Sequence, residues 1–159
     1  MAYCVDTAPG VGAHDEVHTS QKNPLGAVRL FSDGNEYIYL KGVTNGAAKL
    51  VVVYQPGVWT ATLIATTVKG CVAIMQAAVD ASTKYGWCLH VGADVITTRT
   101  ALTSNTPLFA GGVAGYVDVA AVKGDQIIGM HCRNAAGAVG SAQIQISRAT
   151  IGHSNESVG

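Results

Sequence analysis

The feature that most constrains the fold is a succession of short runs of apolar or alternating residues, separated by Gly, Asn, Asp and Pro. Residues 26–31 lead through the dipeptide Asp33-Gly34 into residues 36–43, which is the pattern of a β-hairpin with a tight turn. About ten runs of this kind follow one another at spacings near ten residues, and no segment shows the period and caps of an amphipathic helix. The sequence therefore predicts a single all-β domain, either a β-barrel or a β-sandwich.

Two runs show how the strands are assigned. In residues 85–91, alternation places Tyr85 and Trp87 on one side of the expected strand. Residues 71–79 are apolar enough for a helix, but Gln76 fits poorly on the apolar face that such a helix needs, so we expect a strand there as well. Beyond the first hairpin, strands are expected at residues 49–54, 58–67, 71–79, 85–91, 95–102, 114–122, 125–132 and 142–147.

The domain organisation follows from where this strand pattern begins and ends. Residues 1–24 contain Pro and Gly and show no sustained period, so we expect an extended N-terminal arm that is disordered or becomes ordered on a partner. Residues 25–149 form the expected β-domain, and residues 150–159 a frayed C-terminal tail. The chain has 159 residues, enough to bury roughly 70% of the surface that it exposes when unfolded, without a metal or disulfide.

Charge is scarce and balanced. Only 13% of the residues are charged, against about 25% in an ordinary soluble domain, and ten Lys and Arg offset ten Asp and Glu. The sequence has no basic cluster for nucleic acid or an anionic membrane, and no apolar run reaches the roughly 20 residues of a membrane span. The N-terminus lacks the pattern of a secretory signal, so we expect synthesis in the cytoplasm. A surface with so little charge is expected to be covered by other subunits, or else by Ala, Thr, Ser and Gly.

Cysteines and histidines are the main candidates for reactive chemistry. The four cysteines include no C-x-x-C pair and are expected to be free thiols. Cys88 and His90 would share one face of a strand, and with His131 and Cys132 they could bind zinc or form a Cys-His nucleophile. This spacing matches no zinc motif, and the acidic residues lie in or beside expected turns or on a polar strand face. We therefore predict no enzymatic activity, no metal site and no cofactor.

Aromatic residues are few and lie mainly in the expected strands. One interpretation is a stacking platform formed by Tyr37, Tyr39, Trp59, Trp87 and Tyr116. Stacking of nucleic-acid bases is disfavoured because no Arg or Lys cluster accompanies these rings, whereas binding of sugars stays open. Each ring buries a large apolar area, which favours the interior or a contact between subunits. We expect that structural role for Tyr37, Tyr39, Trp59, Tyr85 and Trp87.

Three segments of the chain resemble one family of viral proteins. The segments are "NPLGAVRLFSDGNEYIYLKGVTNGAA" (residues 23–48), "KGCVAIMQAAVDASTKYGWCLHVG" (69–92) and "GDQIIGMHCRNAAGAVGSAQIQI" (124–146). They are similar to small proteins encoded beside the major capsid protein in tailed bacteriophages. In that family a Pro-Leu-Gly step precedes a strand, an Asp-Gly turn and an aromatic-rich strand, and a later strand carries "YGW". The chain departs from the family pattern in its longer arm and at Cys71.

The resemblance implies a virion structural protein that binds the outer surface of the icosahedral head and stabilises the capsid, a decoration or cement protein. It implies the major capsid protein as the partner, self-association as a homotrimer, and a location on the virion head after synthesis in the host bacterium. We expect the apolar residues of the arm to contact the capsid. The alternatives are a carbohydrate- or host-binding module displayed on the virion, and a structural protein of the neck or tail. The expected capsid contacts are Tyr3, Val5, Val11 and Val17.

Overall fold

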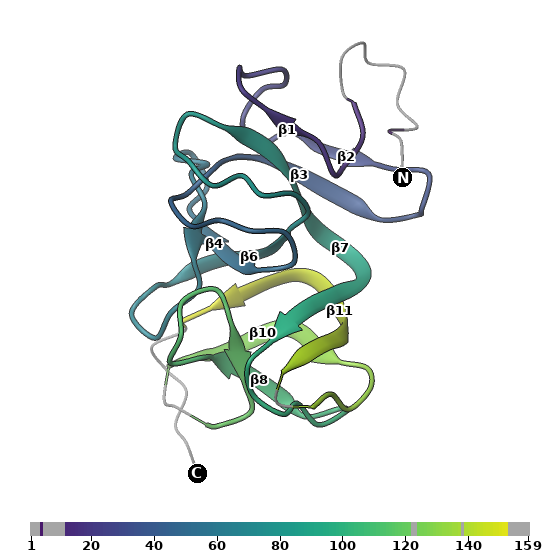
Figure 1. Ribbon diagram of the computed structural model, residues 1–159, viewed down its shortest axis with the longest axis vertical. Helices are drawn as coiled ribbons and strands as arrows, with labels where there is room; N and C mark the ends of the chain where they lie inside the picture. Colours follow the sequence, from purple (N-terminus) through teal and green to yellow (C-terminus); the bar gives the residue numbers. More distant parts are fainter. Residues whose placement is uncertain (1–3, 5–11, 122–123, 138, 153–159) are drawn as a thin grey trace.

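The computed structural model describes residues 4, 12–121, 124–137 and 139–152, and the described residues form β-strands without a helix (Figure 1). The predicted all-β class is confirmed. The strands are β1 (Val17–His18), β2 (Val28–Leu30), β3 (Glu36–Lys41), β4 (Val51–Tyr54), β5 (Thr62–Leu63), β6 (Gly70–Met75), β7 (Tyr85–Thr98), β8 (Pro107–Ala110), β9 (Val117–Asp118), β10 (Gln126–Cys132) and β11 (Gly140–Ile151).

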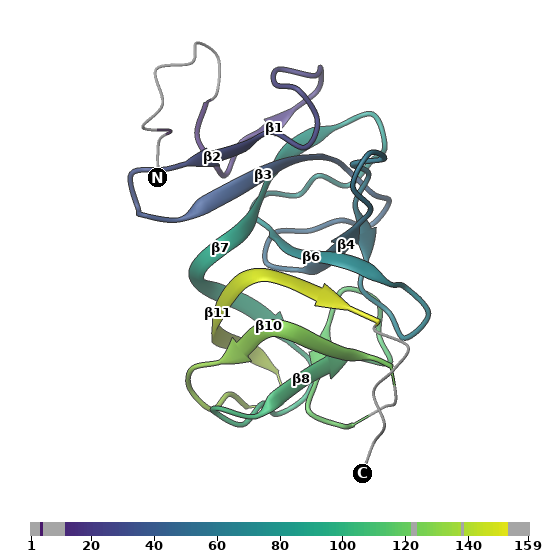
Figure 2. The same cartoon turned by 180° about the vertical axis from the view of Figure 1, so that it is seen from behind.

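All of these strands belong to one antiparallel sheet. Its main path runs β2-β3-β7-β6-β11-β10-β8-β9, with β1 paired to β7, and β4 paired to both β5 and β6. The sheet is not closed, so the described residues form neither a closed barrel nor two separate sheets. Strand β7 passes from the half of the molecule that contains β1–β3 to the half that contains β8 and β10, where β11 pairs with its second part, so both halves belong to a single curled sheet (Figures 1 and 2).

Strand β7 replaces two expected strands. The sequence predicted a break between residues 85–91 and 95–102, but Tyr85–Thr98 is continuous. Gly92, with φ of 136°, lies where the pairing changes: residues 85–91 pair with β3, whereas residues 91–98 pair with β11. A positive φ in this range is accessible to glycine and costly for other residues. Gly92 therefore bends the strand without ending it.

Other expected strands agree with the structure to different degrees. The hairpin is confirmed, since β2 and β3 are antiparallel partners joined by a turn in which Gly34 has φ of 80°. Residues 71–79 contain strand β6, not a helix. Residues 58–67 and 114–122 contribute only the two-residue strands β5 and β9, and strands β1 and β8 were not expected.

The core occupies both faces of strands β3, β4, β6 and the first half of β7. Side chains of consecutive residues point to opposite faces of a sheet. One face carries Tyr39 and Trp87 into the larger cluster, and the other carries Leu40 and Cys88 into a second cluster. The loop after β4 covers this second cluster with Trp59 and Ala61. Burial on both faces explains why these strands read as nearly continuous apolar runs in the sequence.

The boundaries of the domain differ from those expected. Residues 12–24 were expected in an extended arm, yet Ala13, His18 and Asn23 are buried and β1 pairs with β7. His18 Nδ1 lies 2.7 Å from the Tyr39 hydroxyl, and this hydrogen bond fixes β1 on the domain. At the other end, β11 continues past residue 149 to the buried Ile151. The folded unit therefore includes residues on both sides of the expected range 25–149.

Candidate functional site

The aromatic residues singled out in the sequence lie mainly in the core. Tyr37, Tyr39 and Trp87 are 1% exposed or less, whereas Trp59 and Tyr85 are partly buried. The Trp87 ring lies 5.0 Å from that of Tyr39 and 5.4 Å from that of Phe31. Because three of the five rings considered for a stacking platform have no accessible face, these residues do not form one.

The cysteine and histidine residues do not converge. Cys88 lies in the second cluster and Cys132 in the larger one, while His131 is exposed on β10. Burial raises the pKa of the Cys88 thiol to about 12, so this sulfur is a protonated apolar group. Within the part of the chain that the structure describes, His, Cys, Asp and Glu form no group of three or more that could hold a metal ion.

One end of the sheet offers an open edge. Among the strands that the structure describes, β2 pairs with β3 alone, and Cys4 forms an isolated antiparallel bridge with Phe31 just beyond β2. Leu30 is 47% exposed. Its neighbour on the same face, Val28, packs against the second cluster, as does Trp59. We call Val28, Leu30 and Trp59 the β2 rim, an apolar strip at this edge of the sheet.

The expected capsid contacts fall partly outside the described residues. Tyr3, Val5 and Val11 lie there, and the structure gives no account of them. Val17 is 37% exposed on β1, opposite Gly86 of β7. It is therefore accessible to a partner, although its backbone belongs to the sheet.

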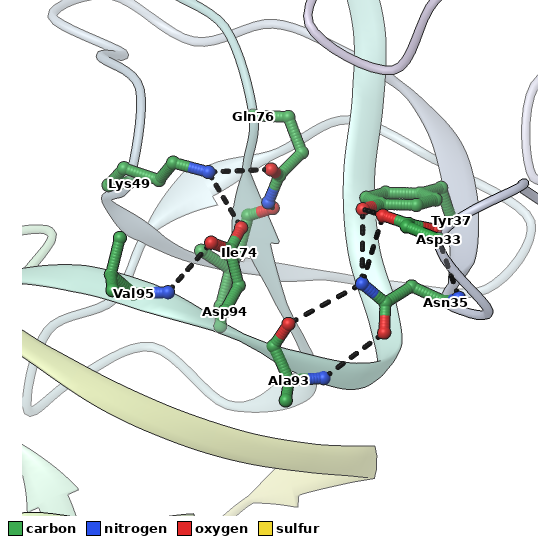
Figure 3. Close-up of polar contacts among 9 residues, drawn as sticks. All are labelled: Asp33, Asn35, Tyr37, Lys49, Ile74, Gln76, Ala93, Asp94 and Val95. Carbon is green, nitrogen blue, oxygen red and sulfur yellow. Dashed lines mark hydrogen bonds and ion pairs between the residues drawn. The ribbon is translucent and has the colours of Figure 1, made fainter. Parts of the chain in front are cut away.

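A second surface feature is a polar hollow of about 410 Å³ beside the bend of β7 (Figure 3). The β2-β3 turn is held against this bend by Asn35, whose side-chain oxygen accepts a hydrogen bond from Ala93 N at 3.2 Å. The Asn35 amide donates to Asp33 Oδ2 at 3.0 Å, and Tyr37 Oη donates to the same oxygen at 2.5 Å. Burial and the bond to Asp33 raise the pKa of Tyr37 well above its usual value. Burial raises the pKa of Asp33, but hydrogen bonds from Tyr37 and Asn35 outweigh it and lower that pKa overall.

The other wall of the hollow is built by Lys49, Gln76 and Asp94, which come from three separate segments. Lys49 Nζ donates to Gln76 Oε1 at 2.8 Å and to Asp94 Oδ2 at 2.6 Å. Gln76 is only 4% exposed and donates to the Ile74 carbonyl. These contacts hold the ammonium and the carboxylate in fixed positions.

A second hollow, of about 180 Å³, is lined by Ala93, Asp94, Val95, Arg133 and Gln143. Because Gln143 lies opposite Val95 in the β7–β11 pairing, its side chain is on the face of the sheet opposite to that of the Asp94 side chain.

We call the larger hollow, beside the bend of β7, the polar groove. From the sequence, Asp33 and Asp94 are expected in or beside turns or on a polar strand face, and no pattern singles out Lys49 or Asn35. The poor fit of Gln76 to an apolar helix face was the only signal of this site.

Acidification is expected to destabilise the protein through His90, which is half-buried on β7 with Nε2 3.2 Å from the Tyr54 hydroxyl. Burial, helped by the charge of Arg148, lowers the pKa of His90 below its ordinary 6.5. The imidazole of His90 therefore binds a proton more tightly in the unfolded chain than in the folded chain. Its contribution to the free energy of unfolding is full above about pH 6.5 and falls as the pH decreases toward the folded-state pKa. Urea unfolding at about pH 7.5 and 5.5 checks this. His90→Gln is expected to reduce the difference in unfolding free energy between the two pH values, whereas the exposed control His131→Gln is expected to leave it unchanged. If the wild type and both variants show the same pH dependence, the assignment to His90 is contradicted.

Comparison with protein-family models found no match, and comparison with curated proteins found no relative. Across its described residues, the chain forms no helix with the length and apolar character needed to cross a lipid bilayer.

Proposed function

We propose that this chain is a structural protein of a tailed-bacteriophage head, which binds the outer surface of the assembled capsid and stabilises it. The observation that supports the proposal best is the open edge at β2, where Leu30 is exposed beside backbone that no strand of the described chain covers. The three segments that resemble capsid decoration proteins include this hairpin. The major capsid protein is the proposed partner.

Strand addition is the mode of binding that fits this edge. An added strand bonds to the outward backbone groups of an edge strand, and its side chains fill adjacent apolar pockets. The outward carbonyl of Val28 accepts a hydrogen bond from Arg29 Nη1 at 3.3 Å. A neighbouring chain could use the rest of the edge and cover the β2 rim. Cys4 already bridges to Phe31 beside this edge.

Stabilisation of the head would follow from mass action. A ligand that binds the assembled shell but not its dissociated subunits stabilises the shell according to its affinity and concentration. Repeated contacts on a symmetric lattice add avidity, which suits the expected homotrimer. Low charge is compatible with such a protein because large parts of its surface would contact other subunits.

The proposal is tested with purified heads that lack the protein. The wild type is expected to sediment with the heads and to raise the temperature at which they break open. Leu30→Asp places a charge on the β2 rim and is expected to weaken binding about tenfold or more, as is deletion of residues 1–11. Val139→Asp is the matched control, because Val139 is 86% exposed but lies just before β11, in the other half of the molecule.

Three results would contradict the proposal. The first is that the wild type fails to bind heads, and the second is that it binds only to tails or necks. The third is that Leu30→Asp and Val139→Asp bind heads equally well. The unfolding transition of each variant is measured alongside, so that a loss of binding is not mistaken for a loss of fold. Sedimentation equilibrium tests the homotrimer separately.

A further inference from the structure

We propose that Lys49 and Gln76 become joined by a covalent amide bond, with Asp94 carrying the protons that the reaction moves. Neither the β2 edge nor head binding takes part in this reaction. Three features of the polar groove support it: the contacts among these side chains, the fixed positions that they occupy, and the shielding of the Gln76 amide from water.

An amine, an amide and a carboxylate meet at one point of the polar groove (Figure 3). Lys49 Nζ lies 2.8 Å from Gln76 Oε1 and 2.6 Å from Asp94 Oδ2. The amide carbon of Gln76 is one bond beyond Oε1, so it lies close to the nitrogen that would attack it. Reacting groups that a fold holds together in this way avoid much of the entropic cost of meeting.

The backbone of Lys49 is held in a conformation that is uncommon for a residue other than glycine. Its φ is 67°, in the left-handed region, where such a residue is strained. Two hydrogen bonds hold it there, since Lys49 N donates to the Met75 carbonyl at 2.7 Å and the Lys49 carbonyl accepts from Thr97 N at 3.1 Å. Met75 directly precedes Gln76. The amine and the amide are therefore fixed relative to each other by the backbone as well as by their own contact.

Exposure of the three side chains favours this reaction over hydrolysis of the amide. Gln76 is only 4% exposed and its amide nitrogen donates to the Ile74 carbonyl, so water has little access to the amide carbon. The side chains of Lys49 and Asp94 are 30% and 20% exposed. Protons and ammonia can therefore exchange with solvent on the side of the amine, whereas water is kept from the atom that is attacked.

The chemistry balances without an oxidant, a reductant or a second substrate. Lys49 passes one proton from Nζ to Asp94, and the neutral amine attacks Cδ of Gln76, which forms the new C–N bond and moves the carbonyl π electrons onto Oε1. When the carbonyl re-forms, the bond between Cδ and Nε2 breaks. Asp94 transfers the two protons lost by Nζ to Nε2, which leaves as ammonium, and Asp94 ends as the carboxylate that it was at the start.

Mass spectrometry of the intact, denatured chain tests the proposal. The folded full-length protein is first incubated for several days at a mildly alkaline pH, which increases the neutral fraction of lysine amines. We expect its mass to fall by that of one ammonia per chain. After tryptic digestion, we expect residues 42–69 to remain uncleaved after Lys49 and to be joined to residues 70–84, which include Gln76. Protein incubated in urea is expected to keep its full mass, because unfolding separates the two side chains.

Three variants separate this reaction from an ordinary hydrogen-bond network. Lys49→Arg keeps the charge and the donors but is expected to abolish the loss of mass, since a guanidinium is not deprotonated in proteins and does not act as a nucleophile. Asp94→Asn keeps the size of the side chain and is expected to slow bond formation about 100-fold or more, because an amide does not carry the protons. Lys84→Arg is the matched control: Lys84 Nζ also lies 2.6 Å from a carboxylate, that of Asp80, and its replacement is expected to leave the reaction unchanged.

The proposal is overturned if the wild type keeps its full mass, if Lys49→Arg loses ammonia as the wild type does, or if the joined peptides lack Lys49 or Gln76. Equal rates in the wild type and Asp94→Asn would overturn the role of Asp94. Circular dichroism shows whether each variant is folded, and the peptide map of the wild type decides the question even where a variant is not. Head binding does not enter these measurements, so failure here is distinguishable from failure of the proposed function.

Discussion

Replacing Trp87 by alanine is expected to lower the free energy of unfolding by about 3–5 kcal/mol. Trp87 is 0% exposed, and its ring contacts those of Phe31 and Tyr39 within the larger core cluster. Its removal deletes these contacts and leaves a cavity in the closely packed interior. A domain of this size is usually stable by about 5–15 kcal/mol, so the loss is a large share of the total.

Two further variants make this prediction specific. Trp59→Ala removes the same side chain from a partly exposed loop and is expected to cost clearly less, since less apolar area is lost from the interior. Trp87→Phe keeps much of the volume and remains measurable if Trp87→Ala does not fold. Urea unfolding followed by circular dichroism gives the free energies. Equal losses for the two tryptophans would show that Trp87 is not central to the core.

The all-β class and the first hairpin could be predicted because their signals are local. Asp33-Gly34 sits between two alternating runs, and the structure places a tight turn there. The same local logic failed between residues 91 and 95, where the sequence predicts a break and the structure has the continuous strand β7 with Gly92 at its bend. Whether a glycine ends a strand or bends it depends on what lies opposite, and here β11 pairs with the continuing strand. A local pattern contains no information on that partner.

The start of the folded domain and the polar groove were harder to predict because both depend on contacts between residues that are far apart in the sequence. His18 belongs to a polar segment, yet it is buried and forms a hydrogen bond with Tyr39, a residue far away in the sequence. Lys49 and Asp94 are far apart in sequence, and they meet because β7 bends next to the segment that precedes β4. Sites of this kind are set by strand register, which only the folded sheet determines.

Replacing Gly92 by alanine is expected to destabilise the protein by about 2–5 kcal/mol and to disrupt the polar groove. Gly92 has φ of 136°, a conformation that an L-residue adopts only with strain, and an added Cβ would overlap the side chain of Asn35. Asn35 would have to leave Ala93, which releases the β2-β3 turn from the bend of β7. Strain and displacement therefore add at this position.

Gly140→Ala separates these two effects. Gly140 has φ of 153°, close to that of Gly92, but an added Cβ there meets no atom of the described residues within 4 Å. We expect this control to show the cost of strain alone, roughly 1–3 kcal/mol. Asn35→Ala combined with Gly92→Ala removes the overlap, so the double variant is expected to lose less than the sum of the two single losses. Equal losses for Gly92→Ala and Gly140→Ala, or strict additivity with Asn35→Ala, would show that Asn35 does not hold the bend.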